Sequence, residues 1–138
     1  MENLLTRLNT WFNRTLTWRM YGLFSARRFL LLRTRGRKSG KVRTVLLTYL
    51  RENATFLVVA SNGGQALMPA WYHNLRAHPD AEIQVGRQRF QVDAVMVPPG
   101  EHERLWAAWL KHHPSYENAQ KKTARRFPLV QLTPRKER

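Results

Sequence analysis

The stretch "RRFLLLRTRGRKSGKVRTVLLTYL", residues 27–50, decides the fold of this chain. Two apolar runs, 27–34 and 42–50, flank a polar segment that contains two glycines. Strands separated by a short loop with glycine are typical of a β-hairpin. The stretch therefore predicts two antiparallel strands. Between residues 33 and 43 the predicted hairpin carries six Arg and Lys side chains and no acid.

The rest of the chain continues with further hairpins and inserted helices. Residues 55–61 are apolar and rich in β-branched side chains, which favours a buried strand. Residues 81–85 and 89–97 flank the turn "GRQ" and predict a second hairpin, and residues 127–134 predict a closing strand. Helices are predicted at 70–78, 98–113 and 114–126. About six mostly antiparallel strands with flanking helices indicate an α+β domain built on a small barrel or strongly curved sheet.

The first 24 residues form a separate segment. Apolar side chains recur there at spacings of three and four, which predicts one amphipathic helix with arginines on its flanks. Two interpretations remain open: the helix covers one end of the core, or it lies on an anionic membrane. The predicted organisation is a helix at 1–24, a domain at 25–134 and a basic tail at 135–138. We expect a cytoplasmic protein, with peripheral contact at the inner membrane face under the second interpretation.

Composition excludes several kinds of chemistry. The chain has no cysteine, so disulfides and thiolate metal sites are excluded. It contains no HExxH pattern, no G-x-S-x-G elbow and no G-x-G-x-x-G fingerprint, and we expect no metal site. With 24 Lys and Arg against 9 Asp and Glu, the net charge of +15 indicates an anionic partner. A bound cofactor is the expected source of any demanding chemistry.

The basic hairpin has three interpretations when taken alone. It is a solvated tip, a nucleic-acid contact, or a cradle in which backbone N–H groups and cations hold a small polyanion. A second segment, "SNGGQALMPAWYHN" at 61–74, favours the third, because its adjacent glycines permit a flat ligand to approach the backbone. Trp71 and Tyr72 are candidate walls for such a ligand or ordinary core aromatics.

Four segments in order resemble the deazaflavin-dependent nitroreductases. They are "TRGRKSGKVR", "VVASNGGQALMPAWYHNLRAHP", "ERLWAAWLKHHPSY" and "FPLVQLTP", and the resemblance runs from about residue 32 to 133. It implies a split β-barrel of the FMN-binding type that uses the deazaflavin coenzyme F-420, which carries a phosphodiester and an oligoglutamate tail. FMN on the same fold is the alternative cofactor.

The resemblance also implies a set of site residues. The hairpin cations that match the family's phosphate and tail contacts are Arg37, Lys38 and Arg43, in a loop shaped with Ser39. Those expected beside the deazaflavin ring are Ser61, Asn62, Gly63 and Gly64, and those expected to support the pocket are Trp71, Tyr72 and Asn74. The outer cations Arg33, Arg35 and Lys41 are expected to face solvent or a membrane.

The implied activity is hydride transfer from reduced F-420 to a flat acceptor such as a quinone, an enone or a nitro compound. Ser61 or Tyr116 is expected to donate a hydrogen bond or proton to the acceptor, with His113 as a substitute donor. Nitroimidazole-activating relatives carry three tyrosines here, and this chain keeps only Tyr116. The alternatives are a split barrel that binds another flavin, haem or a lipid-like ligand, and a nucleic-acid-binding module, although no nucleic-acid partner is expected. A homodimer is a further expectation.

Overall fold

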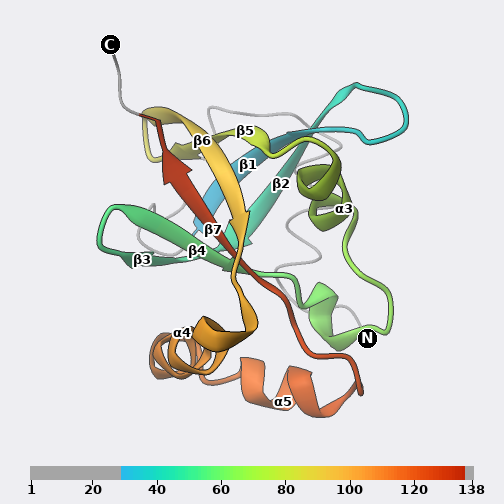
Figure 1. The fold of residues 1–138 in the computed structure, drawn as a ribbon, viewed down its shortest axis with the longest axis vertical. Helices are drawn as coiled ribbons and strands as arrows, with labels where there is room; N and C mark the ends of the chain where they lie inside the picture. The colour runs from blue at the N-terminus through green and yellow to red at the C-terminus, as the bar shows by residue number, and fades with distance from the viewer. Residues whose placement is uncertain (1–28, 136–138) are drawn as a thin grey trace.

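The computed structural model describes residues 29–135 and shows one curled sheet with helices around it (Figure 1). The strands are β1 Phe29–Arg35, β2 Val42–Thr48, β3 Leu50–Glu52, β4 Thr55–Val59, β5 Asp80–Val85, β6 Gln88–Met96 and β7 Leu129–Pro134. The helices are α3 Ala70–Ala77, α4 Pro99–His112 and α5 Tyr116–Lys121, with a short 3-10 turn, η1, at Asn62–Gly64. The predicted helix at 1–24, its proposed membrane contact and most of the tail lie outside the described residues.

The sheet has the strand order β2-β1-β5-β6-β7-β4-β3, and every neighbouring pair is antiparallel. Its two edge strands, β2 and β3, are consecutive in the chain and are separated only by Tyr49. The sheet therefore curls until its edges approach each other, which confirms the predicted α+β fold with a strongly curved sheet.

The predicted strand at 42–50 is two strands in the structure. Residues up to Thr48 pair with β1, whereas Leu50 pairs with Leu57 of β4. The chain changes its partner at Tyr49 because the sheet turns there from one side of the barrel to the other. The described residues accordingly contain seven strands rather than the six expected.

Strand β4 is buried on both faces, which explains its unbroken run of apolar residues. Phe56 and Val58 point into the barrel, where they join the larger core cluster. Leu57 and Val59 point to the opposite side and join a second cluster with Leu105 and Trp109 of α4. The alternation along one strand thus connects the barrel interior to the helical layer.

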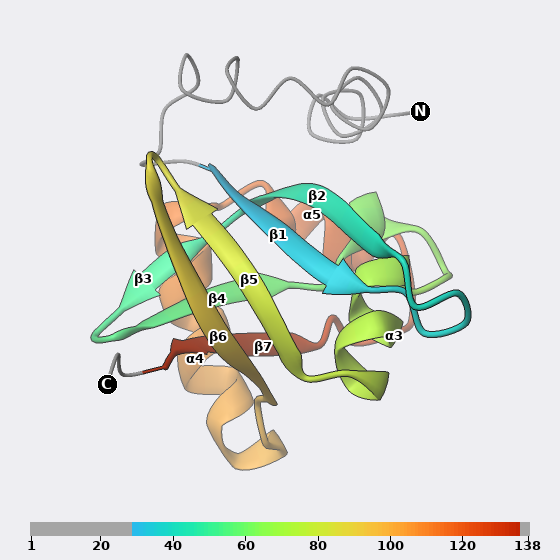
Figure 2. The same cartoon turned by 90° about the horizontal axis from the view of Figure 1, so that it is seen from above.

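The helices lie on two different sides of the sheet. Helices α4 and α5 lie against β4 and β7, and α3 lies beside the loop that joins β1 to β2 (Figures 1 and 2). Trp71 and Leu75 of α3 enter the barrel cluster and close that end of it. Within residues 29–135, no helix is both long enough and apolar enough to cross a membrane.

The first residue of the predicted basic tail is attached to the sheet. The Arg135 N–H donates to the Gln91 carbonyl at 2.8 Å, and its guanidinium forms an ion pair with Asp93 at 2.7 Å. The chain therefore stays hydrogen-bonded to β6 for one residue after β7 ends.

Candidate active site

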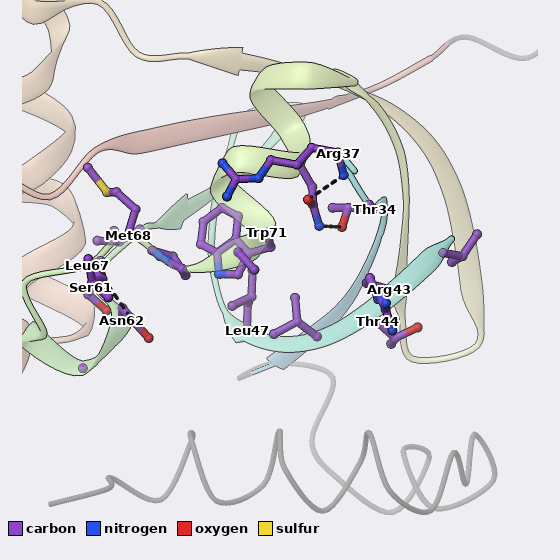
Figure 3. A pocket seen from close by; sticks show the side chains of 18 of the residues that line it. Thr34, Arg37, Arg43, Thr44, Leu47, Ser61, Asn62, Leu67, Met68 and Trp71 are labelled. Atoms are coloured by element: carbon purple, nitrogen blue, oxygen red, sulfur yellow. Dashed lines mark hydrogen bonds between the residues drawn. The ribbon is translucent and has the colours of Figure 1, made fainter. Parts of the chain in front are cut away.

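One cavity of about 990 Å³ is lined by the β1–β2 hairpin, the segment 61–71 and α3. Figure 3 shows its two ends. Arg37, Arg43 and Thr44 lie at the hairpin end, and Ser61, Asn62 and Met68 lie at the other. Between them Trp71 and Leu47 present apolar surface. The cavity therefore joins a cationic end to a polar, uncharged end through an apolar middle.

Local hydrogen bonds shape the hairpin loop. The Gly36 N–H donates to the Lys41 carbonyl and the Gly40 N–H to the Gly36 carbonyl, both at 2.8 Å. Gly40 has a left-handed backbone with φ of +72°, which glycine adopts without strain. Ser39 Oγ accepts a hydrogen bond from the Lys41 N–H at 3.2 Å. Ser39 thus lines the cavity while its hydroxyl also stabilises the loop.

Asn74 attaches this hairpin to α3. Its side chain is buried; Oδ1 accepts from the Arg37 N–H at 3.0 Å, and Nδ2 donates to Thr34 Oγ1 at 3.1 Å. One amide therefore connects the end of β1 to the start of the cationic loop (Figure 3). Asn74 was expected to support the pocket, and the structure shows how its side chain is placed to do so.

The cations that line the cavity differ from Arg33 and Arg35 of the same hairpin in their ion pairing. Arg33 forms an ion pair with Glu82, and Arg35 forms one with Asp80. Arg104 forms ion pairs with both Glu52 and Glu101. The side chain of Arg33 is only 11% exposed, so the expectation that Arg33 is solvated or faces a membrane is wrong. In residues 29–135 no ion pair within 4 Å involves the cavity-lining cations, which are Arg37, Lys38 and Arg43. Their charge is therefore available to an anion.

Three consecutive left-handed residues form the turn at the opposite end. The φ angles of Asn62, Gly63 and Gly64 are 48°, 65° and 84°. Ser61, Asn62 and Gly63 line the cavity, whereas Gly64 does not. A Cβ on Gly64 would lie 2.8 Å from the Ala119 carbonyl oxygen of α5. Gly64 therefore permits close packing of the turn on α5, rather than contact with a ligand.

A cluster of hydroxyl groups lies at this end. Tyr116 forms side-chain hydrogen bonds with Thr48 and Ser61, and all three residues line the cavity. Burial raises the pKa of the Tyr116 phenol above its usual value of 10.0, and the two hydrogen bonds offset part of that rise. Tyr116 is therefore a neutral phenol at physiological pH. Ser61 and Tyr116, which the resemblance implied as alternative donors, are hydrogen-bonded to each other. Thr48 was not predicted.

His113 and Tyr72 lie outside the cavity lining. The Nε2 of His113 lies 3.1 Å from the Tyr49 carbonyl, to which it donates. Its ring packs at a tilt against that of Trp109, with the ring centres 4.5 Å apart. Tyr72 packs against the barrel cluster and contacts Trp71 edge to face. Both side chains thus support neighbours of the cavity without lining it.

Arg125 is a further residue that sequence reasoning did not predict. It precedes β7, and its guanidinium donates to the carbonyls of Ala60, Ser61 and Gln65. Burial lowers the pKa of Arg125, but an arginine remains charged. A sequence pattern does not indicate these contacts, because they join segments 60 residues or more apart.

These features fit a flat cofactor with an anionic tail. The unpaired cations suit phosphate and carboxylate oxygens, the walls at Trp71 and Leu47 suit an aromatic ring, and the hydroxyls suit polar ring atoms. In the described part of the chain, no three His, Asp or Glu side chains lie close enough to hold a metal ion.

Comparison with known proteins identifies a family that uses a cofactor of this kind. The family model described as F420H(2)-dependent quinone reductase matches residues 5–134. An F420H(2)-dependent quinone reductase of Mycobacterium tuberculosis is 46% identical over 109 residues, which cover 77% of this chain and 73% of that protein. A solved F420-H2-dependent reductase (FDR-A) is 34% identical, with a TM-score of 0.71, over 77% of this chain and 94% of its own.

Other solved structures extend the comparison. One described as a domain-swapped dimer is 31% identical, with a TM-score of 0.72, over 89% of this chain and 98% of its own. The haem storage protein HutZ of Vibrio cholerae, at 18% identity and a TM-score of 0.58, shares the fold alone; the match covers 80% of this chain and 84% of HutZ. The chain thus belongs to the F420H(2)-dependent quinone reductases, oxidoreductases of the split-barrel fold that use coenzyme F-420.

Proposed function

We propose that this protein reduces a quinone-type acceptor with reduced coenzyme F-420, at the cavity between the hairpin and the 61–71 segment. The observation that carries the proposal is the cavity itself. It joins three cations, which form no ion pair within residues 29–135, to a partly buried hydroxyl cluster across an apolar middle. Membership of the quinone reductase family supports the choice of acceptor. Enones and nitro compounds are further acceptors to be tested.

The hairpin would hold the anionic half of the coenzyme. Arg37, Lys38 and Arg43 are placed to donate charge-assisted hydrogen bonds to phosphodiester and glutamate oxygens. The backbone of the loop is already shaped by its own hydrogen bonds and by Asn74, so little backbone conformational entropy is lost when the anion binds.

The opposite end would serve the reaction. When bound, F-420 supplies two electrons as a hydride. The chain contributes apolar walls at Trp71 and Leu47, which restrict water, and hydroxyl donors at Ser61 and Tyr116. The phenol of Tyr116 is protonated at neutral pH, because its ordinary pKa of 10.0 already lies well above neutrality and burial raises it further. It can therefore donate to a quinone oxygen that becomes negative, and Thr48 and Ser61 keep it in place.

The cofactor assignment is tested by titrating F-420 into the wild type and into the double variant Lys38→Ala/Arg43→Ala. We expect affinity to fall by about tenfold or more, because charge-assisted hydrogen bonds are lost. Lys111→Ala is the matched control, since this cation of α4 does not line the cavity. Equal affinity in the double variant and the control would contradict the assignment.

The hydroxyl donors are tested by following oxidation of reduced F-420 by a short-chain naphthoquinone. Tyr116→Phe and Ser61→Ala are each expected to lower kcat by about 10²-fold while F-420 still binds. His113→Ala should preserve most of the rate, because His113 lies outside the cavity lining. A rate that is undiminished in both hydroxyl variants would remove these residues from the mechanism.

Homodimerisation is a separate proposal. It is supported by the 31%-identical structure that is described as a domain-swapped dimer. Sedimentation equilibrium of the full chain tests it, and a single monomeric species at all concentrations would rule it out.

A further inference from the structure

The pairing of β4 with β7 leaves one backbone carbonyl without its ordinary partner. The two strands pair up to Val59 and Leu129, and the Ala60 N–H continues the ladder by donating to the Pro128 carbonyl at 2.9 Å. In such an antiparallel pair the opposite residue normally donates in return. Pro128 has no N–H to donate, so the Ala60 carbonyl needs another donor.

Arg125 supplies that donor. Its Nη1 donates to the Ala60 carbonyl at 2.9 Å, the distance of the backbone hydrogen bond beside it. The guanidinium also lies 5.0 Å from the centre of the fully buried Phe127 ring. This cation–π contact holds the guanidinium beside the residues that lead into β7. Arg125 therefore extends the sheet by one hydrogen bond. This bond lies where the chain leaves β4 and enters the turn at residues 61–69, called the 61–69 turn below.

The remaining donors of Arg125 reach into this turn. Nη2 donates to the Ser61 carbonyl at 2.6 Å, and Nε donates to the Gln65 carbonyl at 2.9 Å. Nη1 also lies 3.3 Å from Met68 Sδ, and Nη2 lies 3.5 Å from the Leu67 carbonyl. A planar guanidinium with five donors can satisfy several acceptors at once, and the single ammonium of lysine cannot reproduce that geometry.

These contacts hold a turn that has few hydrogen bonds of its own. Asn62, Gly63 and Gly64 all adopt a left-handed backbone, which asparagine and glycine tolerate. Within the turn, the Ser61 carbonyl accepts from the Gly64 N–H, and the Asn62 side chain donates to the Leu67 carbonyl. Arg125 adds contacts on both sides of this turn, to Ser61 and to Gln65.

We propose that Arg125 is the positioning residue of the active site, which fixes the backbone of Ser61 so that the hydroxyl cluster faces the acceptor. The inference rests on the proposed function for the reaction itself. Arg125 does not line the cavity and acts through Ser61, whose carbonyl it binds and whose hydroxyl contacts Tyr116. A displacement of about 1 Å at such a group can cost about 10²-fold in rate.

The test compares Arg125→Lys and Arg125→Ala with Arg126→Ala. Arg126 is the matched control because it is the adjacent arginine, it is exposed, and the described residues provide it with no hydrogen bond or ion pair. With reduced F-420 and a short-chain naphthoquinone, we expect kcat to fall by about 10²-fold in both Arg125 variants. The dissociation constant of F-420 should rise far less than in Lys38→Ala/Arg43→Ala, because the hairpin binds the anionic tail.

Rescue distinguishes positioning from general stability. Millimolar methylguanidinium should restore part of kcat in Arg125→Ala and should leave Arg126→Ala and the wild type unchanged. Arg125→Lys keeps the charge and much of the stem, so it provides a folded variant if Arg125→Ala unfolds. Wild-type kcat in Arg125→Lys would overturn the inference.

Hydrogen exchange gives a readout that needs no coenzyme. In the free protein, amides of residues 61–68 should exchange faster in both Arg125 variants than in the wild type or Arg126→Ala, whereas those of β5 should not change. Unaltered exchange at 61–68, or an equal increase throughout the sheet, would overturn the inference. Failure of the proposed function would appear differently, as a wild type that neither binds F-420 nor oxidises its reduced form.

Discussion

The cationic hairpin and the 61–69 turn line the same cavity, but they are stabilised over very different distances along the chain. The hairpin closes through hydrogen bonds among residues 36–41, and its outer connection reaches only from Arg37 to Asn74. The turn depends on Arg125, which is 60 residues from Gln65 and 64 from Ser61. A substitution can therefore weaken coenzyme binding at the hairpin without displacing Ser61, or displace Ser61 without weakening coenzyme binding. Substitutions at either end of the cavity should show this.

The largest effect is expected at Gly64. Gly64→Ala would place a Cβ 2.8 Å from the Ala119 carbonyl at a φ of +84°, so we expect a loss of about 3 kcal/mol in unfolding free energy. Urea denaturation measures it. Gly100→Ala in α4 is the control, because its Cβ meets nothing within 4 Å and alanine favours a helix. Equal stability of both variants would show that the turn is not packed on α5.

Asn74→Ala should have the next largest effect and should act on the hairpin end. It leaves the buried Thr34 hydroxyl and the Arg37 N–H without their shared partner, which should cost about 2 kcal/mol. F-420 affinity should fall as well, whereas kcat at saturating coenzyme should change little. Arg76→Ala, exposed on the same helix, controls for the unfolding measurement. A loss of kcat without a loss of F-420 affinity would contradict the assignment of coenzyme binding to the hairpin end and of the reaction to the turn end.

Gly40→Ala is expected to have a smaller effect than Gly64→Ala. Gly40 has a φ of +72°, but a Cβ there meets nothing within 4 Å, so only the backbone strain of about 1 kcal/mol remains. Gly40→Asn should cost less, since asparagine tolerates this conformation. Thermal unfolding of the three proteins measures the order. A Gly40→Ala loss as large as that of Gly64→Ala would remove the contrast between the two glycines.

The smallest effect is expected at alkaline pH and comes from Tyr116. Because burial raises its pKa in the folded state, folding retains a proton that the unfolded chain releases. The stabilisation is present below the ordinary pKa of about 10 and is lost as pH rises through the raised value. The unfolding free energy of the wild type should therefore fall more steeply above about pH 10 than that of Tyr116→Phe. Parallel curves would show that the phenol is not buried.

Features set by neighbouring residues could be predicted from the sequence. The glycines and apolar flanks of residues 27–50 indicated the hairpin, and the unbroken apolar run of β4 indicated a buried strand, which the structure shows to be buried on both faces. The break at Tyr49 could not be predicted, because Val42–Thr48 and Leu50–Glu52 form one apolar pattern and only their partners differ.

Features set by distant residues could not be predicted. Arg125 looked like one more cation in a basic chain, and its role follows from the register that places Pro128 opposite Ala60. Gly64 looked like a ligand contact because it adjoins Gly63, and only the position of α5 shows what it packs against. Thr48 carries no motif and joins the hydroxyl cluster because β2 ends beside Tyr116.

Strand β7 has a consequence for how the protein is made. It lies between β6 and β4, so the sheet before its arrival consists of two separate parts, β2-β1-β5-β6 and β4-β3. A chain emerges from the ribosome N-terminus first, and Arg125 and β7 emerge after every other strand of the described residues. A product of premature termination before Arg125 would carry every cation of the hairpin but no support for the turn. Its sheet would also stay in two parts, one with the hairpin and one with the strand that leads into the turn. Strand β7 is therefore the element that brings the two ends of the cavity together.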